Sequence, residues 1–164
     1  MTKSVEQLIL TLEKESEIYR EILVISTKKR EAIRGNQIEN LEALAGHEQA
    51  LVVTLFKLEE LREKVLDLIL RELKIDHIDN VTQLAQFLLP EERKKVLSAK
   101  DELIVLVKNT VDENRFNNRM IEDKLELIEF NIGMLTQVSD DSGKYDRKAV
   151  NDAYERKNIF DARV

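Results

Sequence analysis

The stretch that decides the fold is residues 97–135, which read LSAKDELIVLVKNTVDENRFNNRMIEDKLELIEFNIGML. Alternating steps of three and four residues through it meet twelve positions, of which nine are aliphatic. A strict period of seven keeps one apolar seam facing a partner helix along the whole length. The stretch therefore predicts a long helix that packs on other helices. The seam positions are Leu97, Lys100, Ile104, Val107, Val111, Asn114, Asn118, Ile121, Leu125, Ile128, Ile132 and Leu135.

The composition favours the same class of fold. The chain has 164 residues, of which 43% are hydrophobic and 35% charged, with only four Gly and one Pro. This balance is typical of one domain built from long helices that bury a core. We expect an all-α fold, an elongated antiparallel helical bundle or coiled coil of three long helices with one short helix and a C-terminal tail.

Start and stop signals divide the chain into four predicted helices. Capping boxes appear at Ser4 with Gln7, at Asn36 with Glu39 and at Asn80 with Gln83, and Gly35 provides a stop. The loop at Gly35 is so short that the first two helices must form an antiparallel hairpin. Because Glu15, Ser26 and Lys29 interrupt the apolar stripe of the first helix, we expect it to be packed on one side. The predicted helices are Ser4–Arg34, Gln37–Lys74, Val81–Leu88 and Pro90–Val138.

The last helix is the longest and sets the predicted domain organisation. At 1.5 Å per residue it would reach roughly 70 Å, so one end is expected to project beyond its partners and expose an apolar surface. We expect a helical bundle domain at 1–138 and a flexible tail at 139–164 that docks on a partner. The tail carries twelve charged residues, six of each sign, yet also Tyr145, Tyr154 and Phe160. These aromatic residues indicate either docking or folding back onto the bundle.

Several classes of function are disfavoured by the sequence. Cys is absent, which excludes disulfides and thiolate chemistry and suits a cytoplasmic location. No apolar run is long enough for a signal peptide or a membrane span, so no membrane insertion is expected. A net charge of −6 argues against nucleic acid as a partner.

Catalytic and metal sites are not expected either. The two histidines, His47 and His77, lack the Glu three residues earlier that di-iron bundles use. Neither a Gly-rich phosphate loop nor a nucleophile elbow is visible. We therefore expect no catalytic residues, no metal and no cofactor.

Two successive seam positions are polar, Asn114 and Asn118, with Asn117 beside them. A buried Asn at a seam position fixes the register of packed helices and lowers their stability. Alternatively, the two amides bind the backbone groups of a partner. The sequence leaves both readings open.

The stretch DENRFNNRMIEDKLELIEFNIGML, residues 112–135, resembles the FlgN family of flagellar export chaperones, as do the polar break and the Tyr-containing tail that follow. The family has a helical hairpin and a long last helix with an Asn-rich turn followed by leucines. The segment SGKYDRKA is more basic than the family's tail leads us to expect.

The resemblance implies a cytoplasmic type III export chaperone that binds the C-terminal helical segments of the hook–filament junction proteins. Such a chaperone keeps these clients unassembled and delivers them to the flagellar export gate. Tyr145 is then the candidate for contact with the gate. The residues to which the resemblance assigns partner binding are Asn114, Asn118, Ile121, Leu125, Ile128, Ile132 and Leu135 of the last helix, with Tyr145 and Phe160 in the tail.

Two other classes of protein compete with this reading. One is a structural coiled-coil scaffold that self-associates through the heptad seam. The other is an enzyme or metalloprotein with a site inside the bundle. Neither the oligomeric state nor the preferred junction protein follows from the sequence.

Overall fold

The computed structural model describes residues 1–136, and residues 137–164 lie outside the described part of the chain. All the described elements are helices, so the expected all-α class is confirmed. The long helices begin and end within two residues of their predicted bounds, apart from the last, whose predicted end at Val138 lies outside the described residues. The elements are α1 (Lys3–Arg34), α2 (Ile38–Leu73), α3 (Val81–Ala85) and α4 (Pro90–Thr136).

The first predicted cap was wrong by two residues. Thr2 caps α1, because its side-chain oxygen accepts a hydrogen bond from the Val5 amide. Ser4 lies inside the helix, where its hydroxyl donates to Glu72 of α2. The third cap is confirmed, since the Asn80 side chain accepts from the Gln83 amide at 2.9 Å.

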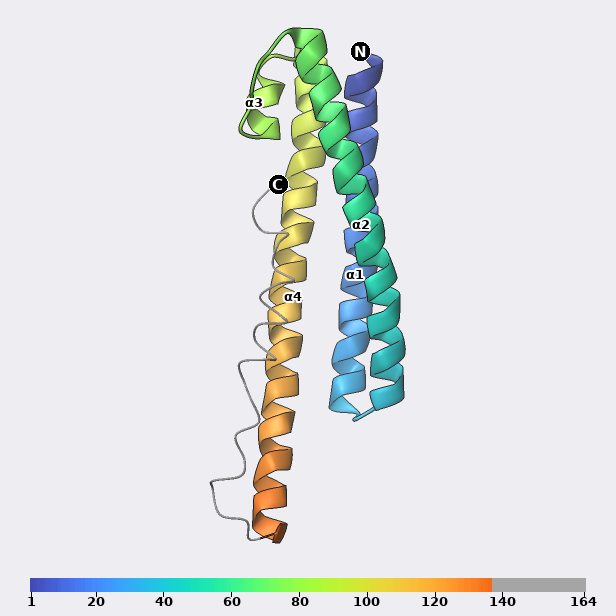
Figure 1. The fold of residues 1–164 in the computed structure, drawn as a ribbon, viewed down its shortest axis with the longest axis vertical. Helices are drawn as coiled ribbons and strands as arrows, with labels where there is room; N and C mark the ends of the chain where they lie inside the picture. The colour runs from blue at the N-terminus through green and yellow to red at the C-terminus, as the bar shows by residue number, and fades with distance from the viewer. Residues whose placement is uncertain (137–164) are drawn as a thin grey trace.

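The turn between α1 and α2 depends on an Asn rather than on a Gly. Gly35 ends α1 as predicted, but its φ of −85° is open to any residue. Asn36 follows with a φ of 53°, a left-handed conformation that Asn tolerates better than most side chains. The prediction that Asn36 caps α2 was wrong, since Gln37 occupies the N-cap position. The two helices run antiparallel on either side of this turn (Figure 1).

The helix α1 packs against both α2 and α4, so the expectation of one-sided packing was wrong. Its buried face includes Glu15, Ser16 and Ser26, each at most 3% exposed. A helix contacted from two directions is buried over a wide arc, and small or paired polar residues then occupy positions between the two contacts. The polar residues that made the stripe look diluted are part of the interface.

The apolar core runs along α1 from Val5 to Ile25, and most of its completely buried side chains lie toward the end of the molecule that holds the N-terminus. There Leu8 and Leu12 of α1, Ile69 of α2 and Leu103 of α4 are almost completely buried. The short helix α3 adds Leu84 to this core by packing against α4, rather than by covering the end of the bundle. Each such side chain contributes about 1.5–3 kcal/mol when fully buried.

A buried ion pair joins α1 to α2. The Arg62 guanidinium donates to the Glu15 carboxylate at 2.8 Å, and both side chains are buried. Burial raises the pKa of Glu15 from 4.5 to about 7, and the positive charge of Arg62 offsets only part of this effect. Burial, together with the negative charge of Glu15, also raises the pKa of Tyr19.

The raised pKa of Glu15 predicts how stability depends on pH. Because the folded protein holds the Glu15 proton more tightly than the unfolded chain, this group favours folding below pH 4.5 and loses that contribution as the pH rises to about 7. Urea unfolding at several pH values between 4 and 8 should show this component in the wild type. It should be missing in Glu15→Gln, which still accepts a hydrogen bond from Arg62. Parallel pH profiles for the two proteins would contradict the assignment.

Candidate interaction surface on α4

The C-terminal part of α4 continues past the α1–α2 turn (Figure 1). Lys124 fixes α4 at the level of the turn by donating to the Arg34 carbonyl at 3.1 Å and to the Asn36 side chain. Every residue from 125 to 136 is exposed. The expectation that one end of the last helix projects is therefore confirmed.

This projecting segment, residues 125–136, has many more apolar side chains than is usual for a helix exposed to water. It contains two charged residues, Glu126 and Glu129, and no basic residue. Exposed apolar patches of this kind mark sites where another molecule binds. The exposed apolar side chains are Leu125, Leu127, Ile128, Phe130, Ile132, Met134 and Leu135, which are 46–85% exposed.

The contact between α1 and α4 changes character along its length. Near the N-terminal end of α4 the buried residues after Glu92 are apolar, namely Val96, Ala99, Leu103 and Val107, while Glu92 itself accepts a hydrogen bond from the Thr2 amide. Further along, the contact is made by Glu113, Asn117 and Lys124, which bond to polar groups of α1 and of the turn. Support for α4 thus passes from apolar packing to hydrogen bonds before the helix leaves the hairpin.

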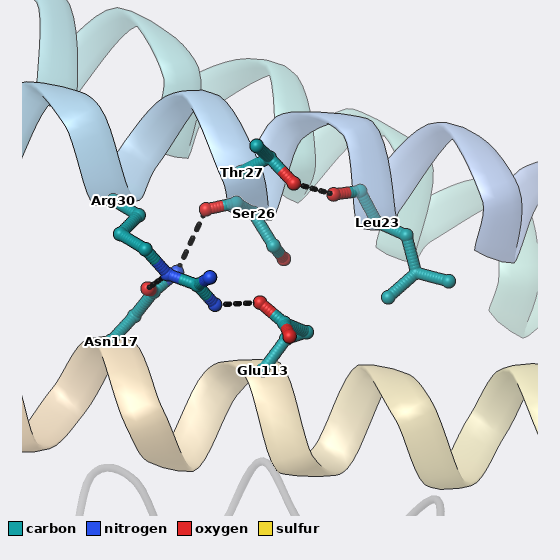
Figure 2. Close-up of polar contacts among 6 residues, drawn as sticks. All are labelled: Leu23, Ser26, Thr27, Arg30, Glu113 and Asn117. Atoms are coloured by element: carbon teal, nitrogen blue, oxygen red, sulfur yellow. Dashed lines mark hydrogen bonds and ion pairs between the residues drawn. The ribbon is translucent and has the colours of Figure 1, made fainter.

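Asn117 is the centre of the polar part of this contact (Figure 2). Its amide nitrogen donates to the Ser26 carbonyl of α1 at 2.9 Å, and its oxygen accepts from Arg30 Nε at 3.4 Å. The Arg30 guanidinium also pairs with Glu113 and lies 4.4 Å from the centre of the Phe116 ring. Both ends of the Asn117 amide are therefore satisfied, although the side chain is only 2% exposed.

The predicted seam and the buried face of α4 differ by one residue. The buried or bonded line is Val96, Leu103, Thr110, Asn117 and Lys124, each seven residues after the last. A shift of one residue rotates a position by about 100° around a helix. The predicted seam positions therefore lie beside this contact. Val107 is the one buried member, and Leu97, Lys100, Ile104, Val111, Asn114, Asn118 and Ile121 are half-buried.

The predicted site residues separate into three groups. Asn114, Asn118 and Ile121 are half-buried beside the hairpin, and within the described chain neither Asn makes a side-chain hydrogen bond. Tyr145 and Phe160 lie outside the described residues. The exposed group on the projecting segment is Leu125, Ile128, Ile132 and Leu135.

Asn117 is the residue that sequence reasoning missed. The available signal was the second series of seven-residue steps, which reaches Asn117 from Val96 and Leu103. That series contains Thr and Lys, so its hydrophobicity is weaker than that of the neighbouring seam. Hydrophobic periodicity alone therefore favoured the wrong register.

Among residues 1–136 no cluster of three or more His, Asp or Glu side chains could hold a metal ion. His47 is exposed, and His77 lies on the surface 3.1 Å from Asp79. None of the helices in this range is long and apolar enough to cross a membrane. The candidate functional site is thus the exposed apolar end of α4.

Replacing Asn117 by Ala should destabilise the protein by about 1–3 kcal/mol, because the Ser26 carbonyl and Arg30 lose a buried partner. Asn114→Ala is the matched control and should change stability by no more than about 0.5 kcal/mol. Urea unfolding followed by circular dichroism measures both. If Asn114→Ala lowered stability more than Asn117→Ala, the assignment of Asn117 as the interface Asn would be wrong.

Comparison of the sequence with known protein families identifies the family of this chain. The sequence matches the family described as FlgN protein over residues 1–152, which covers most of the 164 residues. Searches of curated proteins and of solved structures found no match. FlgN proteins form a chaperone family that is not known to be enzymatic. The chain therefore belongs to the FlgN family, and this membership implies a role as a flagellar export chaperone.

Proposed function

We propose that this protein binds the C-terminal helical segments of the hook–filament junction proteins, keeps them unassembled and delivers them to the flagellar export gate. The observation that carries the proposal is the projecting segment of α4, whose apolar side chains are exposed. Junction proteins polymerise through terminal helices, so their apolar faces must be covered before export. An amphipathic client helix and an exposed apolar helix are complementary in this respect.

The client would lie along one side of α4, on a set of residues that we call the first stripe. Its members follow one another at helical spacings of three or four and therefore share one face. Asn114 and Asn118 precede them on the same flank, where their free amides are available to the polar groups of a client. The first stripe is Ile121, Leu125, Ile128, Ile132 and Leu135.

The tail contributes to the proposal through the family resemblance. The resemblance assigns Tyr145 to contact with the export gate, and Phe160 is a further candidate for partner binding in the tail. Both assignments belong to residues outside the described part of the chain.

The double substitution Leu125→Asp with Ile128→Asp should weaken client binding by about 100-fold or more, because two charges would be buried against an apolar helix. Helicity should stay near normal, since both side chains are exposed in the free protein. Isothermal titration calorimetry with the client C-terminal segment, paired with circular dichroism, tests this. The control is Val105→Asp, a change at a position of α4 that is 56% exposed and distant from the projecting segment.

Two results would contradict the assignment. Unchanged affinity in the double variant would remove the first stripe from the binding site, and a collapse of helicity would show that these residues belong to the core. Stable dimers of the wild type that persist on dilution, without binding of any client segment, would instead favour the self-associating scaffold.

Shortening the chain to end at Val138 tests the tail separately. If Phe160 contacts the client, the shortened chain should bind the same segment about tenfold or more weakly. Calorimetry of the full and shortened chains measures the difference. Equal affinities would assign the tail to another partner.

A further inference from the structure

A second apolar stripe runs along another side of the C-terminal half of α4 and continues onto the projecting segment. Its members are separated by four, seven, three and four residues, so they too share one face. Asp123 occupies the missing heptad position between Met120 and Leu127. We call this set the second stripe; it consists of Phe116, Met120, Leu127, Phe130 and Met134.

The second stripe has no cover within residues 1–136 from Leu127 onward. Leu127 is 60% exposed, Phe130 63% and Met134 67%. At about 100° per residue the centres of the two stripes lie roughly 140° apart around α4. One client helix, which covers a single stripe, would leave the other exposed to water.

The two stripes also differ in composition. The first is purely aliphatic, whereas the second combines aromatic residues with methionines. Aromatic side chains dominate the energetics of binding surfaces, and Met adapts its shape to different partners. The second stripe is thus suited to bind a helix and to tolerate variation in its sequence.

An acidic line separates the stripes along one edge. Glu129 lies four residues after Leu125, so it borders the first stripe. It stands about 100° around the helix from Phe130, so it lies between the two stripes. Glu122, seven residues earlier, occupies the same side of the helix. Within the described residues neither carboxylate has an ion-pair partner. Both carboxylates lie between the stripes, so a helix on either stripe has this negative charge along one of its edges.

We infer that the second stripe binds a second amphipathic helix of the same client, with Lys or Arg residues along the edge that faces Glu122 and Glu129. This inference rests on the proposed function. Two client helices on nearly opposite sides of α4 would hold it between them. A single client fits better than two, because a connection of about six extended residues spans the roughly 18 Å between the axes of two helices that flank α4.

The test compares four variants of the full chain in calorimetric titration with the complete C-terminal helical segment of a junction protein. Leu127→Gln with Phe130→Gln removes the apolar character of the second stripe and should weaken binding about tenfold or more. Val105→Gln is the control at a similarly exposed position of α4 and should bind like the wild type. Glu129→Lys should weaken binding more than Glu129→Gln, and added salt should reduce that difference.

The possible outcomes separate this inference from the proposed function. If the Leu127/Phe130 variant binds normally while the Leu125/Ile128 variant does not, the second stripe is not a client site and the proposed function stands. If the wild type does not bind, both fail. Sedimentation of the proteins without client is the last check. If the wild type is a dimer and the variant Leu127→Gln with Phe130→Gln is a monomer, the second stripe is a contact between copies of the chain. That result would overturn the inference. If Glu129→Lys bound the client segment more tightly than the wild type, the inferred Lys or Arg residues along the edge of the client helix would be ruled out.

Discussion

The packing of α1 against two helices is the constraint on which the rest of the structure depends. Both α2 and α4 are held in place chiefly through α1, whose buried face accommodates Glu15, Ser16 and Ser26 as well as apolar residues. Because α1 ends at Arg34, support for α4 ends near Lys124. The exposed apolar segment that follows is thus a direct consequence of the different lengths of α1 and α4 (Figure 1).

The contact between α1 and α4 changes from apolar packing to hydrogen bonds before α4 projects. Apolar packing at Leu103 and Val107 secures the helix, and hydrogen bonds at Asn117 then fix its orientation without adding exposed apolar area (Figure 2). Beyond Lys124 the helix is sustained by its own backbone hydrogen bonds. Its apolar side chains are exposed, and under the proposed function an export client covers them.

Within residues 1–136 the sequence was sufficient to predict the number and type of the helices and the approximate bounds of the long ones, because hydrophobic periodicity and Gly35 leave clear local signals. Of the three predicted caps only Asn80 was right. The sequence was not sufficient to predict which face of α4 is buried. The seam through Ile104 and Ile121 is more hydrophobic than the line through Thr110 and Asn117, yet the latter faces α1, since hydrogen bonds there replace apolar contacts. The wide burial of α1 was missed for a related reason, because a buried pair such as Glu15 with Arg62 depends on a residue distant in the sequence.

Hydrogen exchange measured by mass spectrometry, with and without the C-terminal helical segment of a junction protein, tests the central claim most directly. The account predicts that amides of residues 125–136 exchange rapidly in the free protein and become protected when the segment binds, while the core around Leu8 and Leu12 is unchanged. Strong protection of 125–136 in the free protein, or protection by the client confined to α2, would contradict it.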